Sequence, residues 1–172
     1  NNRVMKELGN ITDIITEMAA MLSAKLAAAG IHDAAMVGIH TGGVWVAEHL
    51  HRQLAINEPL GSLDISFYRD DFTRIGMNPV VKPSQMPFSI DDRHIILVDD
   101  VLHTGRTIRA ALNELFDYGR PASIMLATLI DRGGRELPIE ANVVGRVIEL
   151  SPDEHIKLTG PEPLELEVQA ST

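Results

Sequence analysis

The sequence contains no cysteine, and this absence excludes two kinds of chemistry. A chain without thiols forms no disulfide and has no thiolate nucleophile. Because disulfides belong mainly to oxidising compartments, their absence is consistent with the cytoplasm, which is the location we expect. No apolar run approaches the roughly 20 residues of a membrane span, and no signal peptide is visible. We therefore expect no membrane segment.

Positive charge is also scarce. The chain has 15 Lys and Arg against 24 Asp and Glu, which gives a formal net charge of -9. Such a chain repels polyanions on average, so nucleic-acid binding would require a local basic patch. Its 172 residues, 45% of them hydrophobic, are enough for a well-formed core. Without an internal repeat or a low-complexity tract, we expect a single domain over residues 1–172.

The stretch 94–107 has the pattern of a buried strand that ends in acidic residues. Four aliphatic residues run directly into Asp99 and Asp100, and a helical pattern follows at 108–118. A continuous aliphatic run predicts a strand buried on both faces of a parallel sheet. Ligands bind at the carboxyl ends of such strands, so both carboxylates are candidates for chemistry.

A loop with the composition of an anion site opens the predicted helix. It reads His103, Thr104, Gly105, Arg106 and Thr107. Backbone N–H groups at a helix N-terminus bind anions, glycine lets the backbone approach closely, and the threonines add hydroxyl donors. Carboxylates repel phosphate but accept hydrogen bonds from neighbouring hydroxyls. A ribose 5-phosphate therefore fits both the loop and the two acids.

This stretch resembles the phosphoribosyl pyrophosphate (PRPP) motif of type I phosphoribosyltransferases, which has four apolar residues, two acids, two apolar residues and a small-residue loop. Most of that superfamily has a small residue at position 103. His103 is similar to the ring found in one branch, the PyrR family of pyrimidine operon regulators that double as uracil phosphoribosyltransferases. The resemblance implies that Asp99 and Asp100 bind the ribose hydroxyls and that residues 103–107 bind the 5′-phosphate.

The acidic pair has two other interpretations. A short apolar run with two aspartates is often only a strand end followed by a solvated turn. Phosphorylation receiver domains also carry acids after a buried strand, but there the pair follows the first strand of the domain. Here 93 residues precede His94. The thirteen-residue context favours the phosphoribosyl interpretation.

A second strand, glycine loop and helix precede the first. Residues 35–39 form a short apolar run, Thr41, Gly42 and Gly43 follow, and a helix is predicted over 44–54. A second anion loop is plausible here, although such a turn alone is weak support. The resemblance to PyrR proteins implies that this loop holds the pyrophosphate of PRPP. Many members have arginine where this chain has Gly42, so one cationic contact is absent.

A long segment without regular pattern follows a predicted strand at Leu63–Tyr68. The segment spans about 69–92 and contains three prolines, and loops of this length in compact domains are usually functional. The resemblance implies a flexible loop that covers PRPP. Arg69 is the candidate for a pyrophosphate contact and, with Asp99 and Asp100, for catalysis. The alternative, a solvated arginine at a strand end, stays open.

A further apolar run, Ser123–Ile130, leads into Asp131 and Arg132. Because these residues again follow a strand, we expect them to face the same crevice and to bind substrate. The stretch 131–139 resembles PyrR members nearly throughout. The order of elements predicts an open, mainly parallel α/β sheet, and the resemblance implies the type I phosphoribosyltransferase fold with flanking helices and a small C-terminal hood at about 132–172.

The resemblance implies an activity, a cofactor and partners. The reaction is transfer of a phosphoribosyl group from PRPP to uracil, giving UMP and pyrophosphate. Mg²⁺ would bind mainly through PRPP, with Asp99 and Asp100 as candidate ligands and no certain protein ligand. A homo-oligomer, dimer or tetramer, is expected from the family.

Two alternatives stay open. One is a UMP-responsive regulator of pyrimidine genes with weak or no enzyme activity, and the other is a phosphoribosyltransferase for purine bases. RNA-binding relatives carry basic groups on the first helix, where this chain has Glu17 and Ala20. The tail is acidic as well. Because phosphate contacts require clustered Lys and Arg, we do not expect tight binding of leader RNA.

Overall fold

Five parallel strands form the centre of the structure, a computed structural model that describes residues 8–65 and 84–170. Their order across the sheet is β2 (Gly61–Leu63), β1 (Ala35–Ile39), β3 (His94–Leu102), β4 (Ser123–Asp131) and β5 (Val143–Val147). Each neighbouring pair is parallel. The prediction of an open, mainly parallel sheet is therefore confirmed, with β3 in the middle.

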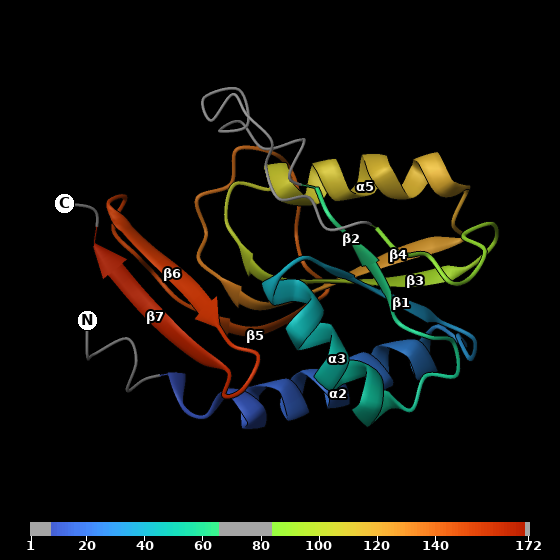
Figure 1. Cartoon of the computed structure of the whole chain (residues 1–172), viewed down its shortest axis with the longest axis horizontal. Coiled ribbons are helices and arrows are strands. Elements are labelled where there is room, and N and C mark those ends of the chain that lie inside the picture. The colour runs from blue at the N-terminus through green and yellow to red at the C-terminus, as the bar shows by residue number, and fades with distance from the viewer. Residues whose placement is uncertain (1–7, 66–83, 171–172) are drawn as a thin grey trace.

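Helices cover both faces of this sheet (Figure 1). The helices α2 (Ile11–Ala28) and α3 (Gly42–Leu54) lie on one face, and α5 (Arg106–Tyr118) lies on the other. The aliphatic run of β3 serves both layers: Ile96 and Val98 belong to the core on the α2 and α3 side. The residues that alternate with them belong to the core beneath α5. This is why the run has no polar residue before Asp99.

α3 and α5 form where the sequence predicts helices, and each starts earlier than predicted. Asn10 caps α2, since its Oδ1 accepts a hydrogen bond from the Thr12 N–H at 2.8 Å. α3 begins at Gly42 and α5 at Arg106, in each case two residues before the predicted start. Glycine, arginine and threonine carry no apolar periodicity, so the sequence pattern shows only the later turns of these helices.

Within the described residues, the strand predicted at Leu63–Tyr68 overlaps the observed strand only at Leu63, because Asp64 and Ile65 are not in a strand. β2 covers Gly61–Leu63 instead, and Gly61 pairs with Val37 of β1. The register depends on backbone hydrogen bonds to β1, which the small residues at 61 and 62 allow although they have no strand-like pattern. Residues 66–68 lie outside the described part of the chain.

The predicted flexible loop, about 69–92, is only partly described. Arg69 lies outside the described residues. Further along, Gln85 exchanges two backbone hydrogen bonds with Ser62, at 2.8 and 2.9 Å, and Ile90 is buried. The last part of the segment is therefore packed against the edge of the sheet beside β2.

The C-terminal region divides between two sheets. β5 lies within the region expected to form the hood, yet it pairs with β4 in the main sheet. β6 (Glu154–Thr159) and β7 (Glu165–Ala170) form a separate antiparallel pair. This pair packs through Ile156 and Leu158 onto the core on the α2 and α3 side. Within the described residues, no helix is long and apolar enough to cross a membrane.

Candidate active site

The two predicted acids lie near the carboxyl end of the central strand. Asp99 is only 5% exposed, and its Oδ1 accepts a hydrogen bond from the Asp100 N–H at 2.9 Å. Asp100 is half-buried, and its Oδ1 accepts one from the Val101 N–H at 2.8 Å. These bonds to backbone groups fix both carboxylates at the edge of the sheet where ligands of parallel sheets bind.

The loop between β1 and α3 lies directly against these acids. A β-carbon at Gly43 would be 2.6 Å from the Val98 carbonyl oxygen and 3.0 Å from the Asp99 α-carbon. A β-carbon at Gly42 would overlap the Asp100 carboxylate. Both glycines are therefore required for this approach, and Thr41 precedes them as an exposed residue. The structure brings the predicted pyrophosphate loop and the predicted ribose acids together.

The loop after β3 has the geometry of an anion site. Gly105 adopts a left-handed conformation, with a φ of 94°, immediately before α5. The Thr104 Oγ1 accepts a hydrogen bond from the Arg106 N–H at 3.2 Å. The remaining N–H groups of a first helical turn have no partner within the helix, so they are available to an anion. Thr107 lies in this turn and is half-buried.

The His103 side chain is held by the segment after β4. Its Nδ1 lies 2.9 Å from the Gly133 carbonyl oxygen. A carbonyl only accepts, so in this contact Nδ1 carries the hydrogen and donates. A β-carbon at Gly134 would be 2.7 Å from the ring. The loop that holds His103 and the segment that follows Asp131 are therefore packed together.

The structure also identifies a residue that the sequence interpretation missed, Arg135. Its guanidinium contacts the Asp131 Oδ2 at 2.6 Å and donates to the His103 carbonyl oxygen at 2.9 Å. The sequence feature that could have identified Arg135 is Asp131, an acid four residues before it at the end of a predicted strand. The Arg132 guanidinium reaches the Ser151 carbonyl oxygen at 3.5 Å, and its backbone N–H donates to the Leu102 carbonyl oxygen. Its role in substrate binding stays a prediction.

The pair of Asp131 and Arg135 alters the ionisation of both residues. Burial by itself raises the pKa of Asp131, but the hydrogen bonds from Arg135 and from the Gly133 N–H, together with the Arg135 charge, outweigh burial and hold the pKa below its ordinary value. The hydrogen bond to Asp131 raises the pKa of Arg135, although its desolvation acts in the opposite direction. Both groups are therefore charged at neutral pH.

The donor set fits Mg²⁺ held mainly by a substrate. Asp99 and Asp100 offer the oxygen ligands that this ion prefers. Within the described residues, no group of three or more His, Cys, Asp or Glu side chains could hold a metal ion. Mg²⁺ usually keeps several waters and binds through one or two carboxylates plus substrate phosphates, and two neighbouring acids match that mode.

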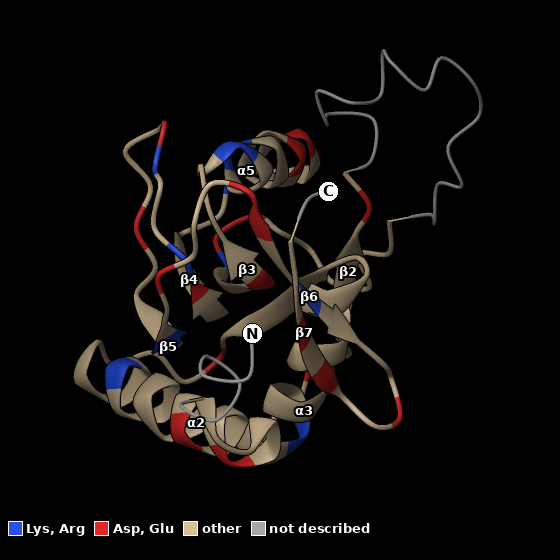
Figure 2. Ribbon diagram, turned by 90° about the vertical axis from the view of Figure 1, so that its left-hand side faces the viewer, with Lys and Arg blue, Asp and Glu red and all other residues tan. Residues whose placement is uncertain are grey.

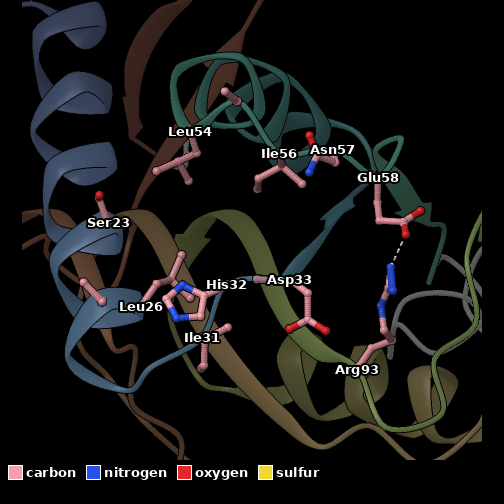
Figure 3. A pocket seen from close by; sticks show the side chains of 13 residues that line it. Ser23, Leu26, Ile31, His32, Asp33, Leu54, Ile56, Asn57, Glu58 and Arg93 are labelled. Carbon is pink, nitrogen blue, oxygen red and sulfur yellow. Dashed lines mark ion pairs between the residues drawn. The ribbon is translucent and has the colours of Figure 1, made fainter.

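Two cavities lie away from this edge. One, of about 410 Å³, is lined by Asp33, Glu58 and Arg93 among others, and Arg93 forms an ion pair with Glu58 (Figure 3). It lies beside the amino ends of β1 and β3. The other, of about 550 Å³, lies between the start of α2 and the turn from β6 to β7. Because ligands of parallel sheets bind at the carboxyl ends, the two acids of β3 and the loops that follow β1 and β3 are the candidate site.

Comparison with known proteins assigns the family. Residues 5–163 match the family model of the phosphoribosyl transferase domain. The chain is 60% identical over 162 residues to the bifunctional protein PyrR of Nitrosococcus oceani, with 93% of this chain and 92% of that protein covered. The chain belongs to the PyrR family of phosphoribosyltransferases. The bifunctional protein PyrR of Pseudomonas aeruginosa is 59% identical, with 93% and 94% covered.

Solved structures agree with the fold of the PyrR family. The hypoxanthine phosphoribosyltransferase of Trypanosoma cruzi matches with a TM-score of 0.62 at 21% identity and covers 81% of this chain and 77% of its own. A hypoxanthine-guanine phosphoribosyltransferase of Bacillus anthracis matches with a TM-score of 0.65 at 19% identity, covering 84% and 80%. These structures establish the type I fold, and the PyrR relatives establish a pentosyltransferase.

Proposed function

We propose that this protein transfers the phosphoribosyl group of PRPP to uracil, giving UMP and pyrophosphate. Membership of the PyrR family supports the reaction class. The observation that carries the proposal is that three groups of residues meet at one edge of the sheet. These are Asp99 and Asp100 of β3, the glycine loop 41–43 and the phosphate loop 103–107.

Each of the three groups of residues matches one part of PRPP. The carboxylates of Asp99 and Asp100 accept hydrogen bonds from the two ribose hydroxyls, because an ionised carboxylate only accepts and a hydroxyl can donate. The first turn of α5, with Gly105 at its start, binds the 5′-phosphate. The glycine loop beside Asp100 binds the pyrophosphate end. The ribose lies between two anion sites, with its C1′ facing the position of the base.

The reaction needs orientation and charge stabilisation more than a protein nucleophile. The bond between C1′ and the pyrophosphate oxygen breaks with its electron pair leaving on pyrophosphate. The bond from uracil N1 to C1′ forms, and the N1 proton is released. Mg²⁺, when bound with PRPP, neutralises charge on the leaving pyrophosphate. Asp99 and Asp100 hold the ribose and favour the positive charge that develops at C1′.

A regulatory role is the second candidate. The relatives at 55–60% identity are called bifunctional, which favours a function in addition to catalysis. A UMP-responsive regulator would use the same site, since UMP is the product. The purine-base alternative has weaker support, because the purine enzymes match this chain at 19–23% identity and share only its fold.

Replacement of the acids tests the site. Asp99→Asn and Asp100→Asn should each lower kcat/KM for PRPP by a factor of about 10 or more, because each loses a charge-assisted hydrogen bond. Asp117→Asn is the control, since Asp117 is an exposed residue at the far end of α5. Unchanged kcat/KM in both folded variants would contradict the assignment.

A further inference from the structure

The segment after β4 lies along the predicted phosphate loop as an added layer of backbone. The Arg132 N–H donates to the Leu102 carbonyl oxygen at 3.0 Å. The N–H groups of Glu136 and Leu137 both donate to the Thr104 carbonyl oxygen, at 2.9 and 3.1 Å. The loop that would bind the 5′-phosphate is therefore supported from outside the β3 to α5 connection.

Arg135 is the half-buried charged link in this layer. Besides the Asp131 carboxylate and the His103 carbonyl, its Nε donates to the Ile139 carbonyl oxygen at 2.7 Å. Its side chain is 17% exposed and that of Asp131 is 14% exposed. An ion pair between Arg106 and Glu136 also joins the two segments, but its two side chains are each 52% exposed. Solvent screens such an exposed pair, so it contributes little.

Asp131 in turn connects this link to the sheet. It is the last residue of β4, and its Oδ1 accepts a hydrogen bond from the Gly133 N–H at 2.9 Å while Oδ2 binds Arg135. Both carboxylate oxygens therefore have partners inside the segment. The connection runs from the end of β4 through Asp131 and Arg135 to the backbone of His103, two residues before Gly105.

We propose that Arg135 is a positioning residue for substrate binding. Its guanidinium holds the segment after β4 and the phosphate loop in one fixed arrangement, so that the 5′-phosphate site is formed before PRPP or UMP arrives. This inference rests on the proposed function, since it assigns residues 103–107 to phosphate binding. A preformed site binds more tightly because less ordering is required on binding.

Arg146 supplies a matched control. It also binds a carboxylate, Glu17 of α2 at 2.6 Å, and a carbonyl oxygen, that of Gly145 at 2.8 Å. It lies on β5 away from the phosphate loop. If Arg135 only stabilises the fold, Arg135→Ala and Arg146→Ala should change the melting temperature but leave substrate affinity unchanged in both.

The experiment measures steady-state transfer from PRPP to uracil together with the stabilisation by UMP in thermal unfolding. Arg135→Ala should raise the KM for PRPP and the Kd for UMP by about tenfold or more, with a smaller effect on kcat. Arg146→Ala should leave the KM for PRPP and the Kd for UMP within about twofold of the wild-type values, because Arg146 is paired outside the site. Millimolar guanidinium should restore part of the UMP affinity of Arg135→Ala.

Arg135→Lys is the second variant. Lysine keeps the charge beside Asp131 but lacks the planar fork that reaches three acceptors, so the KM for PRPP should still rise. Normal PRPP and UMP affinity in either folded Arg135 variant would overturn the proposal. Loss of folding in both would also overturn it, because Arg135 would then stabilise the whole chain. A wild-type protein that neither binds UMP nor uses uracil would instead contradict the proposed function.

Discussion

The α-carbon of Gly42 faces the Asp100 carboxylate so closely that a β-carbon at position 42 would overlap Oδ2. Many PyrR members have arginine at this position. In this chain the conformation of the Asp100 side chain and the size of residue 42 are therefore coupled. A larger residue requires Asp100 to move.

Gly42→Ala tests this coupling. The added methyl group should displace the Asp100 carboxylate and raise the KM for PRPP several-fold. The same substitution in an Asp100→Ala background should cost less, because the carboxylate that overlaps is gone and only the β-carbon of residue 100, at 3.0 Å, stays close. Such non-additivity is the signature of a direct contact and is measured as a double-mutant cycle of kcat/KM. Additive effects would contradict the contact.

Much of the fold and the position of the two acids could be predicted from the sequence, because these features depend on local sequence patterns. The unbroken aliphatic run of β3 and the acids after it placed Asp99 and Asp100 at the carboxyl end of a buried strand, which the structure confirms. The apolar runs at 35–39 and 123–130 likewise predicted strands, and β1 and β4 cover them. Each of these features depends on residues that are neighbours in the sequence.

The features that could not be predicted depend on contacts between distant segments. β2 pairs through the backbone of Gly61 and Ser62, which have no strand-like pattern. The role of Arg135 follows from acceptors at His103 and Ile139, and sequence spacing does not bring 103 and 135 together. Arg69 lies outside the described residues, so its contact with pyrophosphate stays a prediction.

Substitutions at two glycines distinguish the effect of backbone strain from the effect of a change in the phosphate loop. Gly105 and Gly30 both have positive φ, 94° and 68°. An alanine at either position costs about 1 kcal/mol of left-handed strain. At Gly105 the new β-carbon would also be 3.3 Å from the Ile139 side chain, whereas at Gly30 it would meet nothing within 4 Å. Calorimetry should show weakened UMP binding for Gly105→Ala and normal binding for Gly30→Ala. Equal UMP affinities in the two variants would contradict the assignment of residues 103–107 to phosphate binding.

Acid stability should depend on Asp131. Its folded pKa lies below its ordinary value of 3.8, so the unfolded chain takes up a proton first as pH falls. The stabilisation is therefore complete above about pH 5 and is lost as pH decreases through the folded pKa. The free energy of unfolding of Asp131→Asn should fall less steeply below about pH 4 than that of wild type. Asp117→Asn should follow wild type, and parallel curves for all three proteins would refute the linkage.

Leader RNA should bind weakly. Lys and Arg residues of the described chain are dispersed among Asp and Glu rather than gathered on one face (Figure 2). Arg135 and Arg146 are already paired with Asp131 and Glu17. Anisotropy titrations with a pyrimidine-operon leader and UMP should show no tight complex at physiological salt. A tight complex that weakens steeply with salt would contradict this expectation.

Phosphoribosyl transfer to uracil is tested most directly by steady-state assays with PRPP, Mg²⁺ and a panel of bases. We expect UMP and pyrophosphate in equal amounts from uracil, with much lower kcat/KM for hypoxanthine and guanine. Activity with uracil should fall together in Asp99→Asn and Asp100→Asn. A higher kcat/KM for a purine base, or no transfer to uracil by a folded protein that binds PRPP, would contradict the proposed function.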